Sequence, residues 1–242
     1  MDKKSEQKLR RRNERRLSRI ARWDRPLHGW SDRLGAWINM LFVDHGIFRV
    51  FYLNAHSVGG GNLWRSAQPT PNQLRGFHRK GVRSVVCLRG QREYGSWPLE
   101  KETCADLGIA LHEIRIRSRE APERSEILEL KRIFEAIEYP ALIHCKSGAD
   151  RAGLVAALFL LFRENATASD AIRQLSWKYG HIRSAKTGIL HDVIKSYMTH
   201  SQANPISFED WVASEYDPKT ITEGRKTWSA ARFVTDKILR RE

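Results

Sequence analysis

The sequence predicts an α/β fold in which a central, mostly parallel β-sheet is flanked by helices. Apolar segments of strand length (82–88, 109–116 and 141–144) alternate with segments of helical pattern, and this alternation is typical of a parallel sheet. Of the 242 residues, 41% are hydrophobic, enough to bury the core of one domain with extensions. Three cysteines do not indicate a disulfide framework, and a reducing compartment fits them.

The first 61 residues are predicted to lie outside the main domain. Residues 3–22 are rich in Lys and Arg, which indicates a basic helix or a disordered arm. Residues 33–53 follow as one or two amphipathic helices, and the three glycines at 59–61 mark a flexible joint.

The elements after residue 62 alternate between strand and helix. A short strand precedes Pro69, and Thr70 then caps a helix that has Pro71 in its first position and ends at Gly81. Further helices are expected at 97–107, 122–138, 151–163, 168–179 and 186–199. We therefore predict four parts: a basic N-terminal arm (1–33), an amphipathic helical segment with its glycine linker (34–61), a main domain (62–200) and a helical appendage (201–242).

The formal net charge is +14, and residues 1–33 carry +7 of it. A basic tail of this kind is either solvated or attracted to an anionic membrane surface. No nucleic-acid-binding motif is present, so nucleic acid is not an expected partner. The uncharged run 34–43 is too short to span a bilayer, so segment 34–53 either packs on the domain or lies in a membrane interface. Because the charged start is not followed by the apolar stretch and cleavage site of a signal peptide, the expected location is the cytoplasm, with possible contact at the inner membrane face.

The stretch from 141 to 161 carries the strongest chemical signal. An apolar strand ends in His144-Cys145, five small or polar residues follow, and Arg151 then opens an apolar helix. Loop N–H groups and a helix N-terminus converge on one point in such a turn, which makes it an anion-binding geometry. Nearby N–H groups and Arg151 should lower the pKa of the Cys145 thiol below its free value of about 8.5, so the thiolate is a nucleophile at neutral pH.

The other residues of this stretch are expected to bind phosphate or to shape the loop. Arg151 offers a planar fork for two phosphate oxygens, Gly148 permits the turn, and His144 can orient the loop through a hydrogen bond. The loop residues expected to bind phosphate are Lys146, Ser147, Gly148, Ala149, Asp150 and Arg151.

The pattern His-Cys-x5-Arg resembles the cysteine-dependent phosphatases, the protein tyrosine and dual-specificity superfamily. The longer match His-Cys-Lys-Ser-Gly-Ala-Asp-Arg-Ala-Gly is most similar to a bacterial branch of dual-specificity-like enzymes. The segment Arg65-Ser66-Ala67-Gln68-Pro69 resembles the entry of the same family, and the likeness covers roughly 62–200. It implies a sheet flanked by helices and hydrolysis of phosphate monoesters through a phosphocysteine.

The family usually carries an Asp general acid on a loop upstream of the nucleophile, and Glu120 stands in the corresponding loop here. Its carboxyl could protonate the leaving group and then activate water; a first-turn carboxylate is the other interpretation. Asp150 is the second candidate acid. Many relatives carry Ser or Thr directly after the arginine, where its hydroxyl helps the thiolate to leave during hydrolysis of the phosphoenzyme. Ala152 has no hydroxyl, which bears on the rate of turnover.

The residues leave the substrate open. Phosphorylated protein is the first expectation. An anionic phospholipid or inositol phosphate is the alternative, favoured by the net charge, Lys146, Asp150 and the basic amphipathic N-terminus. A non-catalytic phosphate-binding module is the alternative from another class. No metal and no organic cofactor are expected, because no cluster of His, Cys and Asp has metal-ligand spacing, and the sequence carries no signal for an oligomeric state.

Overall fold

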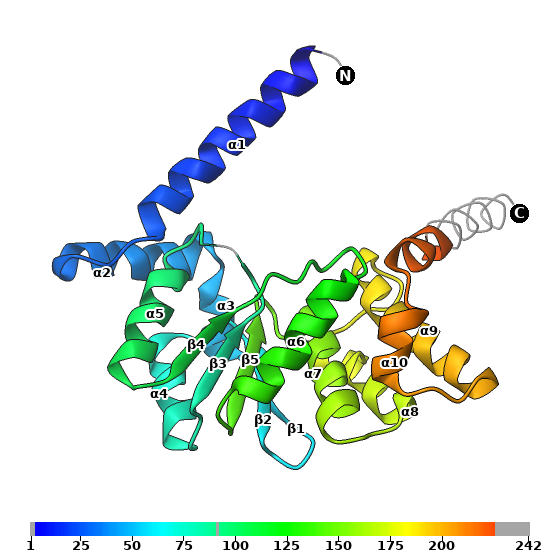
Figure 1. The fold of residues 1–242 in the computed structure, drawn as a ribbon. Helices are drawn as coiled ribbons and strands as arrows, with labels where there is room; N and C mark the ends of the chain where they lie inside the picture. Colours follow the sequence, from blue (N-terminus) through cyan, green and yellow to red (C-terminus); the bar gives the residue numbers. More distant parts are fainter. Residues whose placement is uncertain (1–2, 91, 226–242) are drawn as a thin grey trace, which may run out of the picture.

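The computed structural model describes residues 3–90 and 92–225. Its centre is a five-stranded sheet in the order β1-β2-β5-β3-β4, formed by His56–Val58, Leu63–Ala67, Ala141–Cys145, Ser84–Cys87 and Ala110–Glu113 (Figure 1). The pairs β2–β5, β5–β3 and β3–β4 are parallel, while β1 pairs antiparallel with β2. The expected mostly parallel sheet is therefore confirmed.

Both faces of the sheet are covered, because the strands are apolar on both sides. Val85 and Leu142 face a cluster that includes Leu74 and Phe77 of α4 (Pro71–Arg79) and Cys104 of α5 (Ser96–Asp106). Their neighbours Val86 and Ile143 face the larger cluster on the opposite side. That cluster is built by α6 (Arg124–Ala136), α7 (Asp150–Arg163), α9 (Ile189–Ala203) and α10 (Phe208–Ser214). Successive strand residues thus point to opposite layers, as the pleat requires.

Local sequence signals place several helix ends where they were expected. Thr70 accepts a hydrogen bond from the backbone N–H of Gln73 at 3.3 Å, and the Gln73 side chain accepts one from the Thr70 N–H, which forms a capping box. The helix predicted over 168–179 is wrong in its second half. It divides into α8 (Ala168–Ala171) and two 3₁₀ turns, η2 (Ile172–Gln174) and η3 (Trp177–Tyr179). The short η4 (Lys186–Gly188) precedes α9.

The N-terminal segment is helical and packs on the domain. Helix α1 (Lys3–Trp23) stands away from the body, and α2 (Gly29–Ile38), the π-helical η1 (Asn39–Val43) and α3 (Gly46–Phe51) follow it (Figure 1). A small cluster joins Trp23, Ala36 and Met40 to Leu99 of α5. Strand β1 belongs to the sheet although it lies within the segment assigned to the linker.

Past α9, α10 packs on the large cluster through Phe208, Trp211 and Val212. Residues 218–225 are helical, and the rest of the predicted C-terminal appendage, with Trp228, lies outside the described residues. Among the residues that the structure describes, no helix is long and apolar enough to cross a membrane.

Candidate active site

The site forms where β5 ends and α7 begins, which we call the Cys–Arg loop (residues 145–151). Strand β5 lies between β2 and β3, so the loop emerges from the centre of the sheet at the carboxyl ends of its parallel strands. Gly148 has φ +73°, and a Cβ there would come within 2.6 Å of the Ala67 backbone nitrogen. Only glycine combines this conformation with so close an approach to β2.

The Cys145 thiol is 2% exposed and lies within the curve of this loop. Burial alone would raise its pKa. The charge of Arg151 and hydrogen bonds from the backbone N–H groups of Ala152, Ser147 and Gly148 outweigh burial, so the pKa of the thiol lies below its ordinary value. The loop therefore stabilises negative charge at one point, which is what an attacking thiolate and a bound phosphate both require.

The guanidinium of Arg151 is anchored by a 3.3 Å hydrogen bond from Nη1 to the carbonyl oxygen of Leu88. A second arginine, Arg65 of β2, supports the loop from behind and is fully buried. Its Nη2 donates to the carbonyl oxygens of Gly148 at 2.7 Å and Ala149 at 3.0 Å. Because these carbonyls are held by Arg65, the N–H groups of the loop face the thiol instead. Burial lowers the pKa of Arg65 to about 10, so it stays charged at neutral pH.

His144, which immediately precedes Cys145, is buried against an acidic partner. Its Nε2 lies 2.5 Å from Oε1 of Glu100 on α5, and both side chains are inaccessible to solvent. Burial alone would lower the pKa of His144, but the Glu100 charge raises it to about 10. Potential ligand atoms of Cys87, Glu100 and His144 lie within 4.8 Å of one another, a juxtaposition that sequence spacing did not reveal. Because His144 and Glu100 already pair with each other, their proximity does not require a metal ion, and we assign none.

A second charged network joins the N-terminal segment to the loop. Asp44 is fully buried and accepts two hydrogen bonds of 2.7 Å from Arg89 and one of 2.9 Å from Arg49. Lys146 Nζ lies 3.5 Å from the same carboxylate. Burial would raise the pKa of Asp44, but these cations lower it to about 2. Asn54 adds a further link, since its Nδ2 donates to the carbonyl oxygen of Ser147 at 3.1 Å.

The structure separates the two candidate acids. Asp150 lies in the first turn of α7, and its Oδ1 is 2.8 Å from Nδ1 of the buried His181. Glu120 lies on the loop after β4 with its side chain 55% exposed, and it pairs with Arg117. Among the described residues, no hydrogen bond or ion pair connects Glu120 to the Cys–Arg loop. The motif residues 144–151 are thus brought together, and the Glu120 carboxylate pairs with Arg117.

Several residues around the loop had no assigned role at the level of sequence: Asp44, Asn54, Arg65 and Glu100. Arg65 belongs to the segment 65–69 that resembles the entry of the phosphatase family, and this resemblance was the one feature of the sequence that could have indicated its role. Ala152 is buried and brings no hydroxyl group, but its backbone N–H is one of the donors to the Cys145 sulfur.

In this structure the central strand of a mostly parallel sheet ends at a cysteine with a lowered pKa, and the loop that follows ends at an arginine. This combination of fold and site is that of the cysteine-dependent phosphatases of the dual-specificity-like type. Residues 56–190 match the family described as PTP-NADK, "DSP-PTPase phosphatase fused to NAD+ Kinase". The chain belongs to this family and is a cysteine-dependent phosphatase. No curated protein matches the chain.

Several solved structures are similar to the chain. A mutant form of Tk-PTP is 22% identical with a TM-score of 0.50, and the match covers 62% of this chain and 97% of that one. TpbA of P. aeruginosa is 19% identical (TM-score 0.48, covering 61% and 91%). The catalytic core of the PP-IP phosphatase SIW14 of S. cerevisiae is 21% identical (TM-score 0.45, covering 64% and 96%). At these identities the likeness to Tk-PTP establishes the fold alone.

Proposed function

We propose that the protein hydrolyses phosphate monoesters through a phosphocysteine on Cys145 and that phosphorylated protein side chains are its main substrates. The observation that carries this proposal is the buried thiol whose pKa is lowered by Arg151 and the loop N–H groups. A thiolate held in this way attacks phosphorus in line, while the N–H groups and the Arg151 fork bind the equatorial oxygens.

In the first step the sulfur–phosphorus bond forms and the ester phosphorus–oxygen bond breaks, and the leaving oxygen takes a proton from a carboxyl group. In the second step the same group, now a carboxylate, accepts a proton from water as the water attacks phosphorus, and the sulfur leaves as thiolate. We propose Asp150 for this group ahead of Glu120, because it lies within the Cys–Arg loop and is oriented by His181. Glu120 is the second candidate.

A second candidate substrate class is an inositol phosphate or phosphoinositide. Lys146 extends from the loop with its side chain 40% exposed, and Arg49 and Arg89 lie behind it around Asp44. Three cations around one carboxylate leave an excess of positive charge, which favours a substrate with a second anionic group.

The test has two stages. Turnover of a generic aryl phosphate, abolished by Cys145→Ser, separates an enzyme from a phosphate-binding module. A matched panel of phosphopeptides, inositol phosphates and phosphoinositides then ranks the classes by kcat/KM. Phosphopeptides should rank first; a preference for the inositol compounds that Lys146→Gln removes would transfer the assignment to the second class.

A further inference from the structure

Exposed apolar side chains are concentrated in one short part of the molecule. Of the fourteen large hydrophobic residues that are exposed in the described chain, ten lie between Trp30 and Tyr52. The most exposed are Phe51 (85%), Trp30 (77%) and Phe48 (71%). We call the exposed hydrophobic residues of α2, η1 and α3 the apolar face. Scattered apolar residues need no explanation, whereas a concentration of this kind indicates an interaction surface.

The apolar face is the outer side of a segment whose inner side is anchored. Ala36 and Met40 are buried against Leu99, and Asp44 is buried in the arginine network. Trp30, Leu34, Ile38 and Phe42 recur at intervals of four residues, which places them on a common side of the continuous α2–η1 helix. The exposure therefore results from a fixed orientation of the segment.

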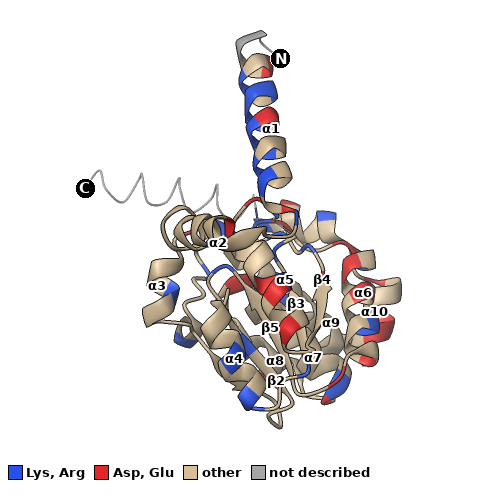
Figure 2. Cartoon of the chain, turned by 90° about the vertical axis from the view of Figure 1, so that its left-hand side faces the viewer, with Lys and Arg blue, Asp and Glu red and all other residues tan. Residues whose placement is uncertain are grey.

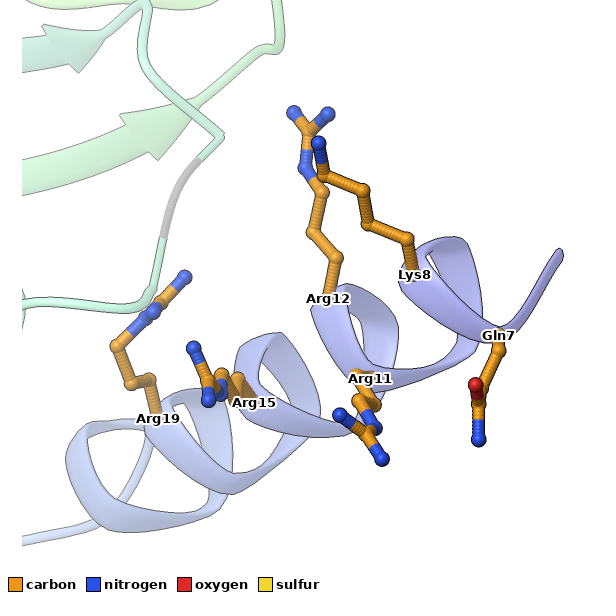
Figure 3. A pocket seen from close by; sticks show the side chains of 6 residues that line it. All are labelled: Gln7, Lys8, Arg11, Arg12, Arg15 and Arg19. Atoms are coloured by element: carbon orange, nitrogen blue, oxygen red, sulfur yellow. The ribbon is translucent and has the colours of Figure 1, made fainter. Parts of the chain in front are cut away.

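A strongly basic helix adjoins this face. Helix α1 contains ten Lys and Arg against two Glu, and Figure 2 shows its basic positions repeated along a helix that stands away from the domain. Arg16 and Arg19 pair with Glu93, and no ion pair within the described residues involves Lys8, Arg11, Arg12 or Arg15. Figure 3 shows Lys8 and Arg12 extending side by side from α1.

We propose that α1 and the apolar face together dock on the surface of a lipid bilayer that contains anionic lipids. Stable peripheral binding needs two signals, and a polybasic segment next to exposed aromatic residues supplies both. The charge of α1 selects an anionic bilayer over a neutral one. A basic helix beside exposed aromatic side chains is typical of interfacial binding, in which the apolar side chains enter the boundary between headgroups and acyl chains.

Docking would place the active site at the bilayer surface. The segment that carries the apolar face also contacts the Cys–Arg loop, through Asp44 and Lys146 and, directly after α3, through Asn54 and Ser147. A phosphatase held in this way meets substrates that are themselves at the membrane. This proposal does not depend on which substrate class is correct.

The experiment is sedimentation of the full chain with phosphatidylcholine vesicles that contain or lack phosphatidylserine. We expect binding to the anionic vesicles, little binding to the neutral ones, and release as salt rises. Arg11→Gln, Arg12→Gln and Arg15→Gln combined should weaken binding at least about tenfold, because each basic residue near an anionic surface contributes up to about fivefold. Phe48→Ser with Phe51→Ser should also weaken it about tenfold or more.

Matched control variants distinguish binding by this surface from a general effect of losing positive charge or an aromatic side chain. Trp177→Ser removes an equally exposed aromatic residue elsewhere, and neutralising the exposed Arg75, Arg132 and Arg173 removes the same charge; both variants should bind like the original chain. The Phe48/Phe51 variant should hydrolyse a soluble aryl phosphate at the original rate. This result would show that the variant is folded, and it tests catalysis independently of vesicle binding.

Three results would overturn the proposal: equal recovery with both vesicle types, no recovery with either, or unchanged binding of the Phe48/Phe51 variant. A concentration-dependent dimer that the same two substitutions abolish would instead assign the apolar face to a second copy of the chain.

Discussion

Asp150 and His181 form a contact of 2.8 Å between Oδ1 and Nδ1 at the edge of the Cys–Arg loop, with His181 buried. The two residues are 31 positions apart in the chain, and the turn after η3 brings them together. The contact fixes the Asp150 carboxyl in one orientation beside the loop.

This contact yields a prediction about the general acid. Protonation of the leaving group matters little for an aryl phosphate with a good leaving group and greatly for an alkyl phosphate. Asp150→Asn should therefore reduce kcat/KM for the alkyl substrate by roughly 10²–10⁴-fold and affect the aryl substrate far less.

Glu120→Gln is the matched variant for this test. With Asp150 as the acid, it should behave like the original enzyme on both substrates. If Glu120→Gln shows the selective loss on the alkyl phosphate and Asp150→Asn does not, the acid is on the loop after β4.

The Arg151 side chain gives a prediction about phosphate binding. Arg151→Lys keeps the positive charge but loses the planar fork that holds two oxygens at once, so it should lose most of the activity. Steady-state kinetics on an aryl phosphate provide the measurement, and a loss of less than about tenfold would exclude Arg151 from the site. Arg117→Lys, on the exposed loop, is the control and should have little effect.

The buried His144–Glu100 pair predicts a pH-dependent stability. The pKa of His144 is raised to about 10 from an ordinary value of 6.5. The pair's contribution is therefore complete below about pH 6.5, where His144 is charged in both folded and unfolded states, and is lost as pH rises toward 10. Urea unfolding at pH 6 and pH 9.5 should show a fall in the free energy of unfolding.

Glu100→Gln removes the partner charge and should be strongly destabilising at pH 6, by roughly 3–5 kcal/mol as for other broken buried pairs. The difference between this variant and the original chain should shrink at pH 9.5. A difference that is the same at both pH values would contradict the charged state of His144.

The Asp44 network predicts that the N-terminal segment supports the domain. Asp44→Asn leaves Arg89 and Arg49 buried without their counter-ion, which should lower the free energy of unfolding by roughly 3–5 kcal/mol. Asp32→Asn, which breaks a partly exposed pair with Arg25, should change stability far less than Asp44→Asn. Since the pKa of Asp44 is lowered to about 2, the contribution should persist at neutral pH and be lost only as pH falls from about 4 toward 2. A neutral-pH unfolding midpoint unchanged by Asp44→Asn would contradict this account.

Most of the fold followed from local signals in the sequence. Apolar strands such as Ala141–Cys145 and caps such as Thr70 depend on neighbouring residues, and the structure confirms the elements they predicted. The helix predicted over 168–179 is broken because Leu175 has a non-helical conformation and Ser176 an extended one. Helix propensity alone does not predict this change of backbone conformation.

The surroundings of the Cys–Arg loop could not be predicted in the same way. Asp44 meets Arg89 across 45 residues, Arg65 meets Gly148 across 83, and Glu100 meets His144 between a helix and a strand. Each contact exists only after the sheet has formed. In the sequence, Asp44 was an interruption of an apolar run, although in the structure it is the fully buried acceptor of two arginines.

The central claim is that Cys145 forms a covalent phosphoenzyme. Mixing the enzyme with an excess of aryl phosphate, quenching in acid within the first turnovers and analysing the peptides by mass spectrometry tests it directly. The account predicts the mass of one phosphoryl group on the peptide that contains Cys145, none on those with Cys87 or Cys104, and none in Cys145→Ser, which should also be inactive. Full turnover by Cys145→Ser, or a phosphoryl group on another residue, would contradict it.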